Sequence, residues 1–107
     1  MKTILEQIQE LVASGRARIS EHGYDELMED HILAGDVVGG VPQAQVVEEY
    51  PDYPKGPCVL VLERDSDGQP VHALWGIPRG HRFPAVLVTA YRPDPEKWSD
   101  DFMRRKE

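Results

Sequence analysis

Cysteine is almost absent from this sequence, in which Cys58 is the single one among 107 residues. One thiol excludes an internal disulfide and a zinc site built from several thiolates, and it fits a reducing cytoplasm. Long apolar runs are also absent, because the longest, residues 58–62, is far shorter than the roughly 20 residues that span a bilayer. The N-terminus lacks the profile of a signal peptide. These absences predict a cytoplasmic protein with no membrane partner.

The length and composition predict one ordinary domain. A chain of 107 residues suits a single domain over residues 1–107 and leaves no room for a second. Apolar residues make up 40% and charged residues 29% of the sequence, which is typical of a folded domain rather than a disordered one. Because composition by itself identifies no activity, the evidence for function lies in the charge pattern and the motifs.

Basic residues are scarce in the first half of the chain. Residues 1–53 hold three Lys or Arg against eleven Asp or Glu, whereas residues 54–107 hold nine against eight. The stretch 21–36 contains six acids and no Lys or Arg, which is typical of the solvated face of a helix. The formal net charge of −7 repels nucleic acid overall. A nucleic-acid partner is therefore expected only at a locally basic segment.

Two helices are predicted near the N-terminus. Apolar residues recur at helical spacing over residues 3–14 and again over residues 21–31. Thr3 occupies the N-cap position of a capping box at the start of the first helix, and Ser20 occupies the N-cap position of the second. Residues 16–19 between the two helices have room for only a short strand.

Four apolar segments rich in β-branched residues predict strands over residues 44–50, 58–64, 71–77 and 85–91. Asp94 and the proline after it predict the start of a final helix. We therefore expect an α+β fold, in which a small antiparallel sheet of about four strands in a meander packs against N-terminal helices, with a C-terminal helix. The exposed edge of so small a sheet favours a homodimer.

His22 is the residue that most suggests catalysis. It lies in the first turn of the second helix, about 160° around the axis from Tyr24. It thus faces away from the side that Tyr24, Leu27 and Met28 are expected to bury. The helix N-terminus favours its neutral form and Glu26 favours its charged form, and a histidine held near neutrality can act as a general base. The alternative is a surface histidine without a role.

Two further residues lie on strands of the predicted sheet. His72 lies on the same side as Leu74, where a histidine is more often a hydrogen-bonded core residue than a catalyst. Tyr91 lies at the end of the last strand, and Arg92 follows it with its side chain on the opposite side. A tyrosine in this position can stack on a base or relay a proton.

Arginines gather in two short segments of the sequence. Arg79, Arg82 and Arg92 fall in a stretch that has no acid, and a guanidinium matches a phosphate in a bidentate way. Arg16 and Arg18 precede His22 closely and are expected to join the same surface. These residues are the candidates for binding phosphate or RNA, and solvated arginines at a sheet edge are the alternative.

Three short motifs resemble a known bacterial family. They are residues 19–22, followed by the acidic helix, residues 71–74 and residues 88–93. Together they resemble the family called domain of unknown function 4258, over nearly the whole chain. That family is similar to the RelE-like toxins of toxin–antitoxin pairs, which share a small α+β fold with a central antiparallel sheet. The resemblance implies a metal-independent endoribonuclease without a cofactor, which acts on RNA or the ribosome and has an antitoxin protein as its partner.

The resemblance also implies a catalytic site, which consists of the motif residues His22, His72, Tyr91 and Arg92. In the expected mechanism, His22 or His72 deprotonates the ribose 2′-hydroxyl. Arg92 then stabilises the charge that develops on the phosphate, and Tyr91 orients a base or the leaving group. A metal is not required, because the 2′-hydroxyl is an internal nucleophile.

Two other functions remain open from the sequence. The acidic balance and the lack of a strong catalytic spacing favour a non-catalytic interaction module, such as a regulator or a decayed toxin. The spacing of four residues between His22 and Glu26 places two ligands on one helix face and allows a metal-dependent hydrolase. No spacing rule supplies a third ligand for that metal.

Overall fold

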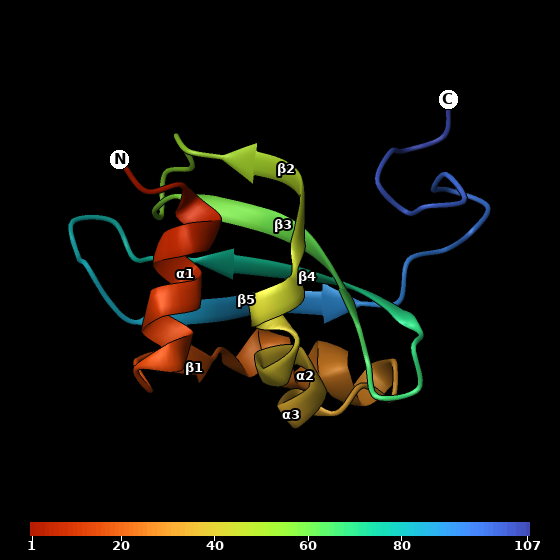
Figure 1. The fold of residues 1–107 in the computed structure, drawn as a ribbon, viewed down its shortest axis with the longest axis horizontal. Helices are drawn as coiled ribbons and strands as arrows, with labels where there is room; N and C mark the ends of the chain where they lie inside the picture. Colours follow the sequence, from red (N-terminus) through yellow and green to blue (C-terminus); the bar gives the residue numbers. More distant parts are fainter.

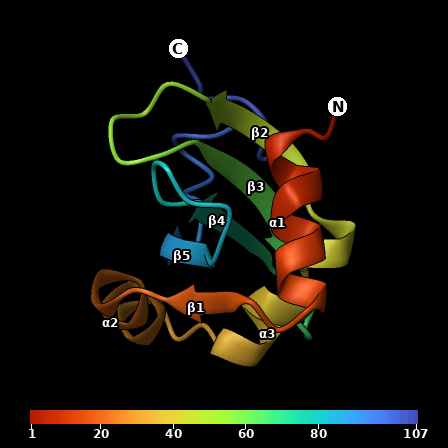
Figure 2. The same ribbon diagram turned by 90° about the vertical axis from the view of Figure 1, so that its left-hand side faces the viewer.

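A five-stranded sheet forms the centre of the molecule in the computed structural model, which describes residues 1–107 (Figure 1). In chain order the elements are α1 (Ile4–Ala13), β1 (Ala17–Ile19), α2 (Glu21–Glu29), α3 (Ala34–Gly39), the 3₁₀ turn η1 (Val41–Gln43), β2 (Gln45–Tyr50), β3 (Cys58–Arg64), β4 (Pro70–Gly76) and β5 (Ala85–Tyr91). α1 crosses one face of the sheet, and α2 lies beside the edge formed by β1 and β5 (Figures 1 and 2). None of the helices has the length and apolar character that crossing a membrane requires.

The sheet is mixed rather than wholly antiparallel, and its strand order is β1-β5-β4-β3-β2. β2 to β5 pair with their neighbours antiparallel, whereas β1 pairs with β5 in parallel, with Ala17 opposite Ala85 and Ile19 opposite Leu87. The expectation of a four-stranded antiparallel sheet is therefore wrong. A strand of three residues carries too little periodicity to be assigned, and its partner lies at the far end of the chain.

The expected C-terminal helix is also wrong. The chain makes one turn after Asp94, whose carbonyl accepts a hydrogen bond from the backbone N–H of Trp98. It then doubles back, because Trp98 and Arg105 form an antiparallel bridge. Inside this loop the hydroxyl of Ser99 donates to Asp101 and accepts from the backbone N–H of Arg104. Such local side-chain bonds compete with helix formation.

The hydrophobic core lies between α1, α3 and one face of the sheet. α1 confirms the predicted capping box, because the Thr3 hydroxyl and the Glu6 carboxylate each accept a hydrogen bond from the other residue's backbone N–H. Its apolar stripe contributes Ile8, which is fully buried, and the sheet contributes Trp75 and Leu87. Apolar burial of this kind stabilises a fold by roughly 25 cal/mol per Å².

The core-facing side of α2 differs from the expected one. Leu27 is buried, but Tyr24 is 52% and Met28 is 75% exposed. α2 presents Gly23 and Leu27 to the sheet, and an added Cβ at Gly23 would lie 2.8 Å from the carbonyl oxygen of Leu87. Because the helix lies along an edge of the sheet, it buries only this narrow stripe and leaves its other apolar side chains in solvent.

Candidate nucleic-acid interface

His72 and Tyr91 form a buried pair on neighbouring strands. His72 is fully buried, its Nδ1 lies 3.1 Å from the Tyr91 hydroxyl, and its Nε2 lies 2.8 Å from the carbonyl oxygen of Phe102. Because a carbonyl only accepts, Nε2 carries the proton and Nδ1 accepts from Tyr91. Burial lowers the pKa of His72 and raises the pKa of Tyr91, so both are neutral near pH 7. Both imidazole nitrogens are therefore hydrogen-bonded within the protein. Trp98 also packs against the imidazole ring in a T-shaped arrangement.

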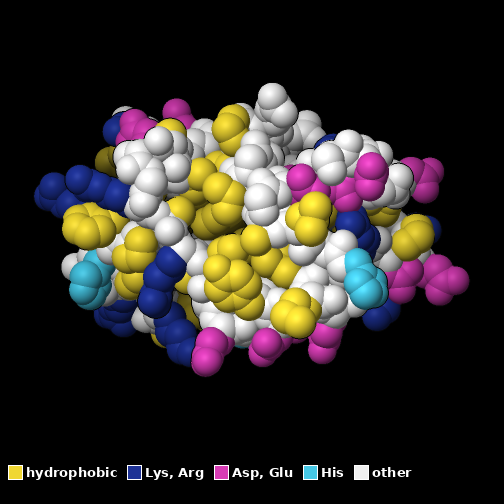
Figure 3. Space-filling model, turned by 90° about the horizontal axis from the view of Figure 1, so that it is seen from below, with side chains coloured by type: hydrophobic (Ala, Val, Ile, Leu, Met, Phe, Trp, Pro, Cys, Tyr) yellow, Lys and Arg dark blue, Asp and Glu magenta, His cyan; other side chains and the backbone are white.

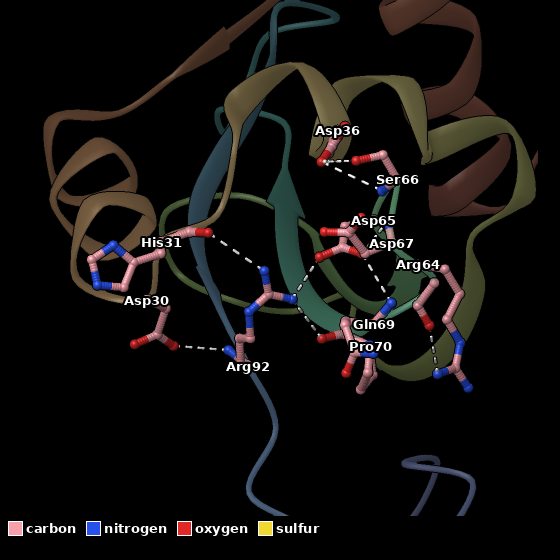
Figure 4. A network of polar contacts seen from close by, with 11 residues as sticks. Asp30, His31, Asp36, Arg64, Asp65, Ser66, Asp67, Gln69, Pro70 and Arg92 are labelled. Atoms are coloured by element: carbon pink, nitrogen blue, oxygen red, sulfur yellow. Dashed lines mark hydrogen bonds and ion pairs between the residues drawn. The ribbon is translucent and has the colours of Figure 1, made fainter.

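Arg92 is held in a separate network (Figure 4). Its Nη1 lies 2.9 Å from the carboxylate of Asp65, and its Nη2 donates to the carbonyl of His31 at 3.4 Å. Its backbone N–H donates to Asp30 at 2.8 Å. Arg92 thus ties the connection between α2 and α3 to the β3–β4 turn, and its charge is directed at Asp65.

His22 lies apart from both groups. Its side chain is 65% exposed, and its polar contact is with Glu26, 3.4 Å from Nε2. The structure therefore brings His72 and Tyr91 together, while His22 and Arg92 each contact other residues. No group of three or more His, Cys, Asp or Glu side chains is arranged to hold a metal ion. The His22–Glu26 pair has no third protein ligand.

The arginines of the two basic segments lie at one end of the sheet. Parallel pairing of β1 with β5 places the start of β1 against the loop before β5, where the N–H of Ala85 donates to the carbonyl of Arg16. An open hollow of about 640 Å³ lies at this end, and it is called here the basic hollow. Its lining includes Lys2, Arg16, His81 and Arg82. Several basic side chains and a histidine are visible at this end of the molecule in Figure 3.

The charges of the basic hollow are largely unneutralised. Lys2 is paired with Glu10 at 2.6 Å, but neither Arg16 nor Arg82 forms an ion pair. The guanidinium of Arg16 lies 5.1 Å from the ring centre of Phe83, which is 53% exposed. A free guanidinium beside an exposed aromatic ring is suited to a phosphate and a neighbouring base.

His81 provides a base at the same hollow. It is exposed, and its Nδ1 lies 3.0 Å from the carbonyl oxygen of Arg79. Because that oxygen only accepts, the neutral form of the ring carries its proton on Nδ1 and has its lone pair on Nε2. His81 lies inside the acid-free stretch from Arg79 to Arg92, and the sequence did not single it out as a site residue. Its place in a proline-flanked loop among arginines is the signal that was available.

Arg18 and Arg79 lie close to the basic hollow. Arg18 and Lys55 line a smaller hollow of about 240 Å³, whose apolar wall includes Val86 and the buried Cys58. The backbone N–H of Arg79 donates to the carbonyl of Lys55 at 2.9 Å, which anchors the loop at this rim. Four of the five arginines proposed for phosphate binding therefore lie at or beside one end of the sheet, together with a lysine that the sequence did not single out. The fifth, Arg92, lies apart in its network with Asp65 and Asp30.

Glu63 is a buried carboxyl that the sequence did not indicate. It is 3% exposed, and neither carboxylate oxygen has a hydrogen-bond partner. Burial raises its pKa to about 8. It lies against Gly40, where an added Cβ would come within 2.7 Å of Oε1. Glu63 is not among the residues that line the basic hollow, and its neutral carboxyl belongs to the packing beneath α3.

Comparison with known proteins adds one family. A family model described as "Domain of unknown function (DUF4258)" matches residues 19–92. The matched range contains His22, His72 and Arg92 as well as the loop of the basic hollow, and it leaves out α1 and the C-terminal segment. No curated protein and no solved structure matches the chain.

Proposed function

We propose that this chain, which belongs to the family described as domain of unknown function 4258, is the toxin of a type II toxin–antitoxin pair and cleaves RNA without a metal. The observation that carries the RNA part is the basic hollow, where unpaired Arg16 and Arg82 adjoin a histidine with a free Nε2. The toxin part rests on the resemblance of the motifs. Single-stranded RNA is the substrate class that suits an open hollow beside an exposed ring.

Binding of RNA in this proposal uses three side chains. Arg16 and Arg82 contact a phosphate through bidentate hydrogen bonds, which compact lysines do not offer. Phe83 supplies a stacking surface for the neighbouring base, worth about 1–3 kcal/mol for a stacked base. The overall charge of −7 opposes RNA binding in general, so binding is expected where basic side chains gather, as they do at this hollow.

Cleavage follows from the position of His81. Its Nε2 takes the proton of the ribose 2′-hydroxyl, and the resulting oxyanion attacks the adjacent phosphorus. The bond from phosphorus to the 5′-oxygen then breaks, giving a 2′,3′-cyclic phosphate and a 5′-hydroxyl that takes its proton from water. Arg16 and Arg82 stabilise the extra negative charge on the phosphorus centre.

The base in this proposal is His81 rather than His22 or His72. Both nitrogens of His72 are hydrogen-bonded inside the protein, and reaching a ribose would require the C-terminal segment to move away. His22 is exposed, but the acidic residues of α2 surround it and repel a phosphate. His72 and Tyr91 instead hold the C-terminal segment on the sheet.

The test is cleavage of free and ribosome-bound RNA by the purified chain. The wild type is expected to cut, and His81→Ala is expected to lower the rate by about 10² or more. Arg16→Ala and Arg82→Ala should weaken RNA binding, measured by fluorescence anisotropy. Arg104→Ala is the matched control, because Arg104 is exposed on the C-terminal segment, and it should behave as wild type. Intact RNA beside a working positive control would refute the proposal.

A second function, protein interaction without catalysis, is favoured by one separate observation. Three exposed apolar side chains lie on α2 and at the start of α3, namely Tyr24, Met28 and Leu33. Exposed apolar side chains that gather on one face mark interaction sites more often than catalytic ones. A regulator or a decayed toxin would retain this surface while its RNA chemistry is lost.

A further inference from the structure

Three exposed apolar side chains lie on α2 and at the start of α3. Tyr24 is 52%, Met28 is 75% and Leu33 is 67% exposed. Tyr24 and Met28 are four residues apart and therefore lie one above the other on the same side of α2. Figure 3 looks at this side of the molecule and shows hydrophobic side chains gathered in the middle of the face. These three residues are called the apolar patch.

The apolar patch continues into a groove. The groove measures about 240 Å³ and runs between α1, β1, α2 and α3. Its apolar wall is formed by Val12, Ala17, Ile19, Tyr24, Val38 and Trp75. Arg18, the one charged residue on the wall, also lines the hollow beside Lys55. Tyr24 belongs to both the patch and the groove, so one apolar surface joins all three helices.

An acidic flank borders the apolar patch. Around the α2 axis, Asp25 and Glu29 follow Tyr24 at about 100° and 140°, and Met28 lies before them at about 40°. Glu21, Asp25 and Glu29 are all exposed, and none of the three forms an ion pair. Acidic side chains border one edge of the hydrophobic surface in Figure 3. The surface therefore combines apolar side chains with unneutralised negative charge.

We infer that this surface binds an amphipathic helix of a partner protein, with apolar residues at helical spacing and Lys or Arg along one flank. The apolar side chains of that helix fill the groove and cover Tyr24 and Met28, and its basic flank meets Asp25 and Glu29. Charge complementarity sets the orientation and speeds the encounter, while burial of the apolar patch supplies most of the affinity.

A second copy of this chain fits the surface poorly. A two-fold dimer sets the same patch against itself, so the acidic flanks of the two copies would adjoin the same interface. Residues 21–36 hold six acids and no Lys or Arg, so this segment offers the partner copy no counter-charge. Like charges brought together in this way oppose association.

The test is a selection of displayed helices on the full chain. The library fixes Leu at positions i, i+3, i+4 and i+7 and randomises the flanking positions among charged and neutral residues. It is selected on the wild type and depleted on Tyr24→Glu. The matched control is Tyr53→Glu, because Tyr53 is 51% exposed on a loop away from the helices. Both variants place a new carboxylate at an equally exposed tyrosine.

The expected result is enrichment of Lys and Arg on one flank of the selected helices. Their affinity should fall at least tenfold with Tyr24→Glu and less than twofold with Tyr53→Glu. Replacing Asp25 and Glu29 together by Asn and Gln should abolish the preference for a basic flank and flatten the dependence on salt. RNA binding by Tyr24→Glu should equal that of the wild type, which separates this inference from the proposed ribonuclease activity.

Two results would overturn the inference. Selected helices with neutral or acidic flanks would show that the acidic flank does not select the partner. Helices that bind Tyr24→Glu and the wild type with equal affinity would show that the apolar patch is not the binding surface. A concentration-dependent dimer in sedimentation that Tyr24→Glu returns to a monomer would show that a second copy covers the patch instead.

Discussion

The guanidinium of Arg92 lies 2.9 Å from the carboxylate of Asp65, and only 5% of the Asp65 side chain is exposed. The backbone N–H groups of Asp67 and Gln69 also donate to that carboxylate, and the bond from Gln69 is the main cause of its lowered pKa. The hairpin turn thus positions an acid, and Arg92 neutralises it. This relationship makes Arg92 a structural residue in addition to any part in binding phosphate.

Arg92→Ala is expected to lower the free energy of unfolding, because it leaves the carboxylate of Asp65 without its charged partner. Urea unfolding measures the loss. Arg64→Ala is the control, since Arg64 is exposed on the same hairpin, and it should change stability by less than about 0.5 kcal/mol. A double-mutant cycle with Asp65→Asn that shows no coupling would contradict the interpretation.

Glu63→Gln is expected to remove a loss of stability that the wild type undergoes as the pH rises. Burial raises the pKa of Glu63 from 4.5 to about 8, so the folded state holds a proton that the unfolded chain releases at lower pH. The stabilisation is complete below about pH 4.5 and is lost as the pH rises through about 8, by at most about 1.4 kcal/mol per pH unit. The variant should therefore be more stable than wild type at about pH 9 and similar to it at about pH 5.

Urea unfolding across this pH range measures the effect. Glu49→Gln provides the control, because Glu49 is exposed on β2 and its replacement should leave the pH profile unchanged. Parallel profiles for wild type and Glu63→Gln would mean that the carboxyl is solvated in the folded protein.

Acid is expected to loosen the C-terminal segment through His72. Burial lowers the pKa of His72 below 6.5, so its contribution to stability is complete above about pH 6.5 and is lost as the pH falls towards the lower folded value. Protonation places a second N–H on the ring and disturbs the bond that Nδ1 accepts from Tyr91. The protection factors of residues 93–107, which correct hydrogen exchange for its intrinsic dependence on pH, should therefore fall between about pH 7 and pH 5.

His72→Phe keeps an aromatic ring against Trp98 but cannot be charged. The variant should lose the acid-dependent change while being less stable at neutral pH by about 1–3 kcal/mol. His22→Gln serves as the control, because it removes an exposed histidine that lies apart from the C-terminal segment. If the exchange of residues 93–107 responds to pH equally in His72→Phe and in wild type, another group controls the segment.

Two glycine substitutions test how closely α2 approaches the sheet. Gly23→Ala should cost about 1–3 kcal/mol, because the new Cβ would lie 2.8 Å from a Leu87 carbonyl that already accepts from Ser20. Gly35→Ala lies in α3 with no atom within 4 Å of the added Cβ. It should be neutral or stabilising by up to about 1 kcal/mol. Thermal unfolding of the pair gives the comparison, and equal effects would argue against close packing at Gly23.

Only part of the candidate site could be predicted from the sequence. The acid-free stretch pointed to Arg79 and Arg82, but the gathering of Arg82 with Arg16 around one hollow depends on a parallel pairing that no local pattern encodes. Only the structure shows that His81 lies at this hollow and that its Nδ1 contacts the Arg79 carbonyl, which fixes its tautomer. Glu63 reads in sequence as an ordinary acid at a strand end, and its burial is a property of the elements packed around it.

The sequence by itself determined the elements whose cause is local. The capping residues of α1 and the apolar runs of β3 and β5 confirm the ranges expected for them, because hydrogen bonds and alternation within a few residues define such elements. Tertiary structure alone decided the parallel addition of β1, the folding back of the chain after Asp94 and the exposure of Tyr24 and Met28. These features depend on contacts between segments far apart in the chain, where packing overrides local preference.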